Sequence, residues 1–166
     1  MGQSIGIILA GGIGARFGAD KPKQYCTIFD KEMIWYSIEA FKKATLIDDF
    51  IVVVDQTEMQ SQRLAKEYGV TLVLGGDTRN KSLKNALDYI NEHYPDCEKF
   101  IENNAACPMI TPELIDAAPN LKLICESATG INNIDIEYAA SKGIPVRNAV
   151  GYSTSSVVQA TFMHIL

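Results

Sequence analysis

The residues best suited to chemistry lie near the amino terminus, in a glycine-rich loop followed by two lysines. An apolar run, Ile7-Ile8-Leu9, leads into the sequence AGGIGARFG (residues 10–18), and KPKQ (residues 21–24) follows shortly after. Glycines let backbone N–H groups approach a phosphate chain, and the Arg and Lys side chains offset its negative charge. The loop therefore predicts a site that holds the triphosphate of a nucleotide.

Two common phosphate-binding motifs do not fit this loop. The dinucleotide fingerprint GxGxxG begins with Gly12 and Gly14, but Phe17 stands where the third glycine belongs. The Gly-Lys-Ser/Thr ending of a P-loop is also missing. The remaining pattern, Gly-Gly-x-Gly-x-Arg with Lys-Pro-Lys-Gln after it, is more specific than glycines alone.

The elements around this loop alternate between strands and helices. Apolar runs predict strands at 4–9, 50–54, 70–74 and 99–102, with a short extended piece at 26–29. Helical spacing predicts helices over 32–44 and from Leu83 to Pro95, and Thr57 with Gln60 predicts a capping box for a helix that Gly69 ends. Thr111-Pro112 predicts a further helix start. This order is typical of a parallel sheet with its ligand site at the carboxyl ends of the strands.

The pattern begins again after Asn120. We expect a strand at 121–126, a helix from Asp135 to Lys142 with Gly143 behind it, an edge strand at 144–147 and an apolar helix at 155–166. The predicted fold class is a Rossmann-like three-layer α/β sandwich with a mostly parallel sheet, extended by a βαβα piece. We divide the chain into residues 1–116 and 117–166.

Composition narrows the functional classes. In 166 residues, hydrophobic residues make up 47% and charged residues 21%, which indicates a globular chain. The net charge of −5 disfavours non-specific binding to nucleic acid or an anionic membrane. No apolar run approaches the roughly 20 residues of a transmembrane helix, and no basic leader precedes the first strand. The four scattered cysteines favour reduced thiols in a cytoplasmic protein over a zinc site.

Residues 5–116 resemble the cytidylyltransferases that make CDP-methylerythritol and CDP-ribitol, which act on 2-C-methyl-D-erythritol 4-phosphate or ribitol 5-phosphate. Three stretches carry the resemblance: residues 10–18, residues 22–24 and GGDTRNKS at 75–82. The resemblance implies the nucleotide-diphospho-sugar transferase type of fold, CTP and a polyol phosphate as substrates, and Mg²⁺ as a cofactor.

The resemblance also assigns roles to single residues. It implies that Arg16 and Lys23 are the catalytic cations that stabilise the charged transition state. It implies a nucleotide-binding set formed by the first glycine loop and the second loop: Ala10, Gly11, Gly12, Gly14, Gly76, Asp77 and Ser82. These roles agree with the chemistry, because attack on an α-phosphorus needs mainly in-line positioning and cationic stabilisation.

The chain departs from the family pattern in two places. The family carries His-Asp-Ala-Ala-Arg-Pro after its fourth strand, and its Asp helps to hold Mg²⁺, whereas this chain has NNAACP at 103–108. Asn104 thus offers a neutral carbonyl where the cation favours a carboxylate, and Cys107 replaces a cation. We therefore assign no metal ligand. The family's substrate-binding half, with a further metal carboxylate and Lys, is expected to be absent after Asp116.

Residues 118–166 resemble a fragment of the D-isomer-specific 2-hydroxyacid dehydrogenases. APNLKLIC at 118–125, ATGINNID at 128–135 and NAVGYST at 148–154 carry this second resemblance. It implies that the loop at 128–130 corresponds to the one that receives a substrate carboxylate. The dinucleotide glycine motif, the catalytic Arg and the Glu/His pair of that family have no counterpart here, so we expect no NAD(H) binding.

Three functional hypotheses follow. The leading one is a nucleotidyltransferase that binds CTP and transfers CMP to a sugar-alcohol phosphate with release of pyrophosphate. The others are an incomplete chain derived from a dehydrogenase and a nucleotide-binding module without turnover. We expect binding to be better preserved than turnover, with no nucleic acid or membrane as a partner.

Overall fold

The computed structural model describes residues 2–12, 21–103, 109–126, 130–148 and 150. Its centre is a sheet of four parallel strands in the order β5-β4-β1-β6. The strands are β1 (Gln3–Leu9), β4 (Asp49–Val54), β5 (Thr71–Leu74) and β6 (Cys97–Asn103). β1 and β4 are apolar on both faces because both faces are covered, and Ile7 and its register partner Ile51 have no exposed surface.

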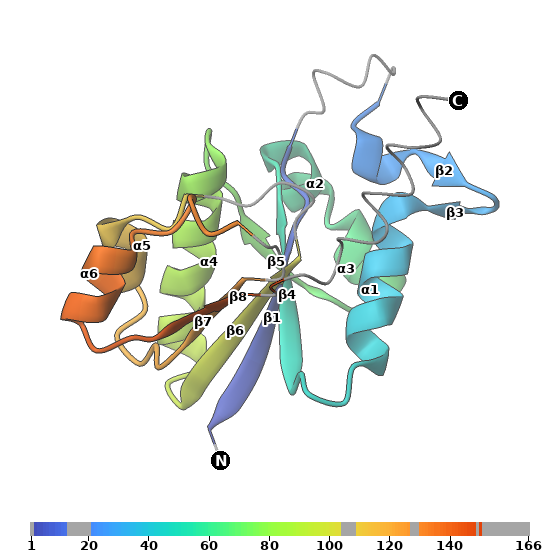
Figure 1. Cartoon of the computed structure of the whole chain (residues 1–166). Helices are drawn as coiled ribbons and strands as arrows, with labels where there is room; N and C mark the ends of the chain where they lie inside the picture. The colour runs from blue at the N-terminus through green and yellow to red at the C-terminus, as the bar shows by residue number, and fades with distance from the viewer. Residues whose placement is uncertain (1, 13–20, 104–108, 127–129, 149, 151–166) are drawn as a thin grey trace, which may run out of the picture.

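Helices cover both faces of this sheet (Figure 1). On one face lie α1 (Met33–Lys43), α2 (Gln56–Ser61) and α3 (Arg63–Tyr68), and on the other lie α4 (Arg79–His93) and α5 (Pro112–Asp116). The predicted stripe of α4 forms the core with β1 and β4: Leu83, Ala86, Leu87 and Ile90 are all buried. Ile34 and Ile38 of α1 form the second core with Leu64 of α3. The predicted three-layer α/β sandwich is confirmed.

The strand order fixes where a ligand can bind. The chain runs from β1 to β4 and β5 on one side, and then places β6 on the other side of β1. In open α/β sheets, ligands bind outside the carboxyl ends of the two strands that flank such a reversal, here β1 and β6. The glycine loop begins at Ala10, directly after β1, and therefore starts at this end of the sheet.

A short turn and a hairpin follow the glycine loop. They consist of the 3₁₀ turn η1 (Lys23–Tyr25) and the antiparallel strands β2 (Thr27–Ile28) and β3 (Lys31–Glu32). Phe29 at the tip of the hairpin has a φ of 56° and a side chain that is 95% exposed. The extended piece predicted at 26–29 thus pairs with the residues just after it.

The predicted helix from Thr57 to Gly69 is corrected by the structure. Asp55, not Thr57, is the N-cap, and its Oδ1 accepts a hydrogen bond of 2.9 Å from the backbone N–H of Glu58. Gln62 then takes a left-handed φ of 54° and divides the segment into α2 and α3. The predicted end at Gly69 is confirmed, since it adopts a φ of 67°.

A second, smaller unit follows α5. β7 (Ile124–Glu126), α6 (Ile136–Ser141) and β8 (Val146–Asn148) form a βαβ unit whose two parallel strands make a sheet of their own. This confirms the predicted strand, helix and strand, and Asp135 caps α6 with a hydrogen bond of 2.9 Å to the Tyr138 N–H. The helix predicted at 155–166 lies outside the described residues.

The second unit packs on the first through α5. Ile115 is buried against Ala139 and Ile144, and the Asp116 carboxylate accepts a hydrogen bond of 2.7 Å from the Tyr138 hydroxyl. These contacts cross the division that we predicted at residue 116. None of the helices in the described part of the chain has the length and apolar character needed to cross a membrane.

Candidate functional site

Two loops meet at the carboxyl end of β4. The Ala10 N–H donates a hydrogen bond of 2.7 Å to the carbonyl of Val53, and the Gly75 N–H donates one of 2.8 Å to the carbonyl of Val54. A Cβ on Gly11 would lie 3.3 Å from the backbone carbon of Val54, which is a close approach. The glycine loop after β1 and the loop after β5 are therefore held on either side of the same strand end.

The glycine loop itself is open toward solvent at Gly12. A Cβ on Gly12 would meet no heavy atom of the described residues within 4 Å, so this backbone is accessible to a ligand. Before it in the loop, Ala10 is buried and Gly11 is half-buried. Gly14 and Arg16, which we also predicted as site residues, lie outside the described residues.

Lys23 is brought to this loop by the residue that follows it. The Lys23 side chain is exposed on η1 and forms no ion pair with any residue in the described part of the chain. The side-chain nitrogen of Gln24, Nε2, donates hydrogen bonds to the carbonyls of Ala10 at 2.6 Å and Gly12 at 2.9 Å. The turn that bears Lys23 is thus tied to Ala10 and Gly12 at the start of the glycine loop.

Tyr25 anchors the same turn to the body of the protein. The guanidinium carbon of Arg63 lies 5.1 Å from the centre of the Tyr25 ring, a cation–π contact. The Tyr25 hydroxyl is buried and has no hydrogen-bond partner among the described residues. Burial raises the pKa of this hydroxyl, and the nearby carboxylates of Glu58 and Asp55 raise it further. Tyr25 therefore stays neutral and acts as an aromatic anchor.

The buried carboxylate of Glu58 forms an ion pair with Arg63. Its side chain is only 6% exposed, its Oε1 accepts a hydrogen bond of 2.6 Å from the Leu64 N–H, and its Oε2 lies 3.5 Å from Arg63 Nε. Glu58 thus caps α3 and pairs with Arg63. The sequence analysis missed this role, although Asp55 and Glu58 have the spacing of a capping box that begins directly after β4.

The second loop carries Gly76 and Asp77, and Ser82 lies in the first turn of α4 directly after it. The Ser82 hydroxyl accepts a hydrogen bond of 3.0 Å from the Gly76 N–H and donates one of 3.0 Å to the carbonyl of Thr78. Ser82 is only 8% exposed, so it orders the loop from inside. A Cβ on Gly76 would clash with the Lys81 side chain, which explains the glycine.

Asp77 is the exposed member of this loop. Its carboxylate lies 2.8 Å from the Lys81 ammonium, one helical turn along the chain, and the hydrogen bond from Lys81 lowers the pKa of Asp77. Asp77 is therefore an ionised acceptor at the rim of the site. Such a carboxylate can accept a hydrogen bond from a hydroxyl or amine of a ligand while it also pairs with the Lys81 ammonium.

The residues described do not form a metal centre. No cluster of three or more His, Cys, Asp or Glu side chains among them is placed to hold an ion. Asn104, at the position of the metal-binding Asp in the family pattern, and Cys107, at the position of its Arg, lie outside the described residues. No Mg²⁺ ligand is therefore assigned among the described residues.

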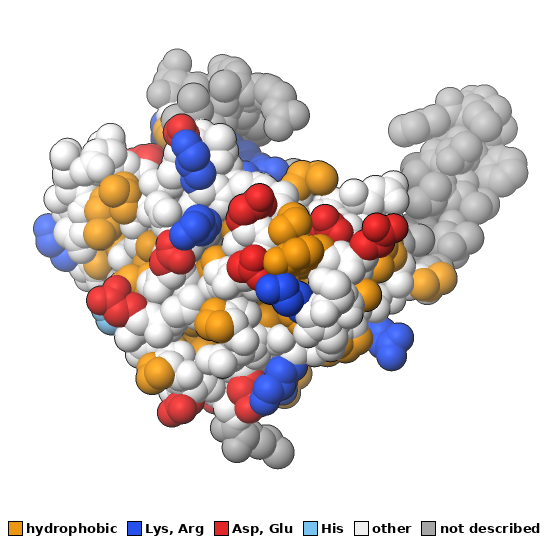
Figure 2. Space-filling view, turned by 90° about the vertical axis from the view of Figure 1, so that its left-hand side faces the viewer, with side chains coloured by type: hydrophobic (Ala, Val, Ile, Leu, Met, Phe, Trp, Pro, Cys, Tyr) orange, Lys and Arg blue, Asp and Glu red, His pale blue; other side chains and the backbone are white. Residues whose placement is uncertain are grey.

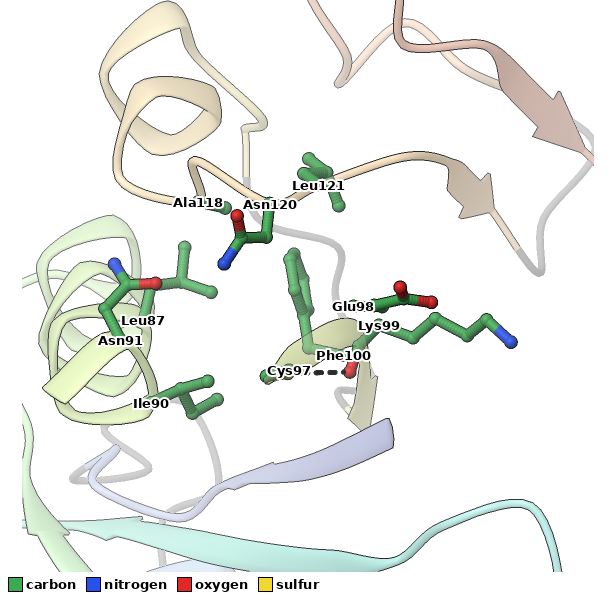
Figure 3. Close-up of a pocket in the computed structure, with 10 residues that line it drawn as sticks. All are labelled: Leu87, Ile90, Asn91, Cys97, Glu98, Lys99, Phe100, Ala118, Asn120 and Leu121. Carbon is green, nitrogen blue, oxygen red and sulfur yellow. Dashed lines mark hydrogen bonds between the residues drawn. The ribbon is translucent and has the colours of Figure 1, made fainter. Parts of the chain in front are cut away.

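A pocket elsewhere in the molecule is too small for a substrate. It lies at the amino end of β6, where Leu87 and Ile90 of α4 face Phe100 beneath Leu121 (Figure 3). Its volume of about 20 Å³ is close to that of one water molecule. The face that carries α5 and α6 mixes acidic, basic and apolar side chains, and no continuous basic area gathers on its described part (Figure 2).

Comparison with known sequences identifies relatives across most of the chain. The model of the family "IspD: 2-C-methyl-D-erythritol 4-phosphate cytidylyltransferase" matches residues 5–138. A D-ribitol-5-phosphate cytidylyltransferase from Xenopus tropicalis is 38% identical over 100 residues, which are 58% of this chain and 24% of the relative. A 2-C-methyl-D-erythritol 4-phosphate cytidylyltransferase from Thermosipho melanesiensis is 26% identical over 163 residues, which are 95% of this chain and 65% of the relative. The chain thus spans less than two thirds of either relative.

Solved structures show the same fold. The bifunctional IspDF from Campylobacter jejuni superposes with a TM-score of 0.58 at 18% identity, covering 91% of this chain and 50% of that one. Rv0371c from Mycobacterium tuberculosis H37Rv superposes with a TM-score of 0.54 at 18% identity, covering 90% and 89%. The glycine loop, the parallel sheet and the family match over 134 residues agree with one another. This chain belongs to the IspD family of 2-C-methyl-D-erythritol 4-phosphate cytidylyltransferases.

Proposed function

We propose that this chain binds CTP at the carboxyl edge of its sheet and transfers CMP to a sugar-alcohol phosphate. One observation carries the proposal: Gln24 joins the start of the glycine loop, at the carboxyl end of β1, to the turn that bears Lys23. An accessible glycine backbone after β1 and an exposed lysine on η1 that forms no ion pair with the described residues are suited to a triphosphate.

The proposed reaction is an in-line displacement at the α-phosphorus of CTP. An oxygen of the acceptor phosphate forms a bond to the α-phosphorus, the bond from this phosphorus to the α–β bridging oxygen breaks, and pyrophosphate leaves with the electron pair. Lys23 and Arg16 stabilise the negative charge that develops on the phosphoryl oxygens. Mg²⁺ enters as part of the Mg–CTP substrate.

The acceptor is proposed from the relatives. Their names specify D-ribitol 5-phosphate or 2-C-methyl-D-erythritol 4-phosphate cytidylyltransferases, and both acceptors are phosphates of short polyols. We propose the same chemical class here. Asp77 and Ser82 belong to the segment that we assign to the base and ribose of CTP, with Gly76 giving the backbone its close turn.

Calorimetric titration with CTP and Mg²⁺ tests binding. Saturable binding is expected, and Arg16→Ala and Lys23→Ala are each expected to weaken it by roughly tenfold or more, because each removes a charge-assisted phosphate contact. Lys43→Ala is the control, since Lys43 is an exposed lysine at the far end of α1. An absence of binding at millimolar CTP would contradict the proposal.

A second candidate is a nucleotide-binding module without turnover, and Asn104 favours it because it replaces the metal-binding carboxylate of the family pattern. Pyrophosphate release from CTP with ribitol 5-phosphate or methylerythritol phosphate separates the two. Release that Lys23→Ala abolishes identifies the enzyme, whereas CTP binding without release identifies the module.

The dehydrogenase resemblance of residues 118–166 remains a proposal about the second unit alone. What supports it is the βαβ order of β7, α6 and β8, which matches the predicted elements. Titration of NADH followed by its fluorescence tests whether this piece retains cofactor binding. We expect no enhancement, because the dinucleotide glycine motif has no counterpart in residues 117–166.

A further inference from the structure

We propose that Gln24 is a positioning residue for the nucleotide, whose side-chain amide turns two backbone carbonyls of the glycine loop away from the phosphate chain. Gln24 Nε2 donates to the carbonyl of Ala10 at 2.6 Å and to that of Gly12 at 2.9 Å. These residues lie 14 and 12 positions before it, so a single side chain connects the start of the glycine loop to the turn that bears Lys23. The inference rests on the proposed function for its ligand.

The direction of these carbonyls decides whether the loop can bind an anion. In a planar trans peptide, the C=O and the following N–H point in opposite directions. With the Ala10 carbonyl directed at Gln24, the Gly11 N–H is directed away from Gln24. A phosphate is attracted by N–H groups and repelled by carbonyl oxygens, so this orientation favours binding. Without the amide, glycine residues can rotate freely and lose it.

The amide of glutamine is specifically suited to this task. One nitrogen with two hydrogens serves both carbonyls, and a swap of the amide would place an oxygen against two oxygens, which is unfavourable. An ionised glutamate at position 24 donates nothing and would repel both carbonyls. Asparagine is one methylene shorter and reaches one of them at most.

The position of Gln24 also sets that of Lys23. Within η1 the Tyr25 N–H donates to the Pro22 carbonyl at 2.9 Å, and the Cys26 N–H donates to the Lys23 carbonyl at 3.0 Å. The Tyr25 ring packs against the Arg63 guanidinium of α3, so η1 is fixed to the body of the protein through Tyr25 and to the glycine loop through Gln24. The same contact therefore orients the glycine backbone and determines its spacing from the cation.

The test compares Gln24→Glu and Gln24→Asn with a matched control, Gln62→Glu. Gln62 Nε2 also donates to a backbone carbonyl, that of Met59 at 2.5 Å, but it lies at the break between α2 and α3. CTP affinity is measured by calorimetry, amide hydrogen exchange of residues 10–12 in the free protein by mass spectrometry or NMR, and stability by urea unfolding.

At pH 7.5, Gln24→Glu is expected to weaken CTP binding by roughly tenfold or more and to speed exchange at residues 10–12, because two hydrogen bonds are lost. For Gln24→Asn, the CTP affinity and the exchange rate at residues 10–12 are expected to lie between those of the wild type and those of Gln24→Glu. At about pH 5, the Gln24→Glu defect is expected to shrink as the carboxyl gains a proton that it can donate. Gln62→Glu is expected to show the wild-type affinity and exchange even if its urea midpoint falls.

The results test the positioning role of Gln24 separately from the proposed binding of CTP. If Gln24→Glu and Gln24→Asn bind CTP and exchange like the wild type, the positioning role is wrong. If all variants including Gln62→Glu lose affinity in proportion to stability, Gln24 is merely structural and the inference also fails. If the wild type does not bind CTP, yet Gln24→Glu alone speeds exchange at residues 10–12, the role of Gln24 in ordering the start of the glycine loop stands and the proposed function falls.

Discussion

Glu58 offers a direct test of how the turn that bears Lys23 is held in place. Its carboxylate is 6% exposed and has two partners, the Leu64 N–H at 2.6 Å and Arg63 Nε at 3.5 Å. Glu58→Ala removes both, whereas Glu58→Gln keeps an oxygen for the Leu64 N–H and loses only the charge. The two variants therefore separate the cap of α3 from the ion pair.

The expected magnitudes follow from burial. Leu64 has no exposed surface, so loss of its acceptor costs about 1–3 kcal/mol, the usual cost of an unsatisfied buried donor. Arg63 is 39% exposed and keeps Glu32 at 3.0 Å, so its lost contact adds about 0.5 kcal/mol. Glu58→Ala is thus expected to destabilise by about 1.5–3.5 kcal/mol and Glu58→Gln by about 0.5 kcal/mol.

Urea unfolding followed by circular dichroism measures these differences. Glu67→Ala is the control, because Glu67 pairs with the same Arg63 at 3.3 Å but is 49% exposed, and we expect a loss below about 0.5 kcal/mol. In addition, Glu58→Ala should weaken CTP binding, since Arg63 then holds the Tyr25 ring less firmly. The reasoning is refuted if Glu58→Gln costs as much as Glu58→Ala.

Three further outcomes are expected. Gly12→Ala should keep the wild-type urea midpoint and weaken CTP binding in calorimetry, whereas Gly76→Ala should lower stability by about 1–3 kcal/mol through its clash at the start of α4. The hydrogen bond from Lys142 lowers the pKa of Asp116 in the folded protein. The ionised carboxylate therefore stabilises the fold above its unfolded-state pKa, and this stabilisation is lost as the pH falls through its folded-state pKa. Asp116→Asn should lower the urea midpoint at pH 7 and match the wild type near pH 2. Phe29→Gly should raise stability by about 0.5–1 kcal/mol in the same assay, because it relieves a left-handed φ of 56° at an exposed tip.

Much of the fold could be predicted because its signals are local. β1 and β4 are predominantly apolar runs that are typical of strands covered on both faces, and the structure extends each by one residue at its start. The apolar residues at helical spacing in α1 and α4 lie in a core, whereas Met33 and Trp35 beside the stripe of α1 are only half-buried. Asp135 and Gly143 likewise mark the two ends of α6.

The features that escaped prediction depend on contacts between distant residues. The break at Gln62 exists because the Glu58 carboxylate bonds to the Leu64 N–H across it, and a capping pattern alone does not reveal where that side chain turns. Gln24 was part of a recognised sequence pattern but had no assigned role, because its partners are the carbonyls at 10 and 12. Arg16, Gly14 and Asn104 lie outside the described residues, and their roles stay predictions.

The contacts that hold the glycine loop do not involve the second unit. They come from β4, from η1 and from α3, all of which precede Gly69 in the sequence. The second unit instead packs on α5 through Ile115 and Asp116, next to α4 on the other face of the sheet. Changes in β7, α6 or β8 can therefore alter stability without displacing the nucleotide loop. In the proposed mechanism Lys23 on η1 serves both CTP binding and turnover, whereas the substitution at Asn104, which follows β6 in the sequence, is expected to affect turnover alone.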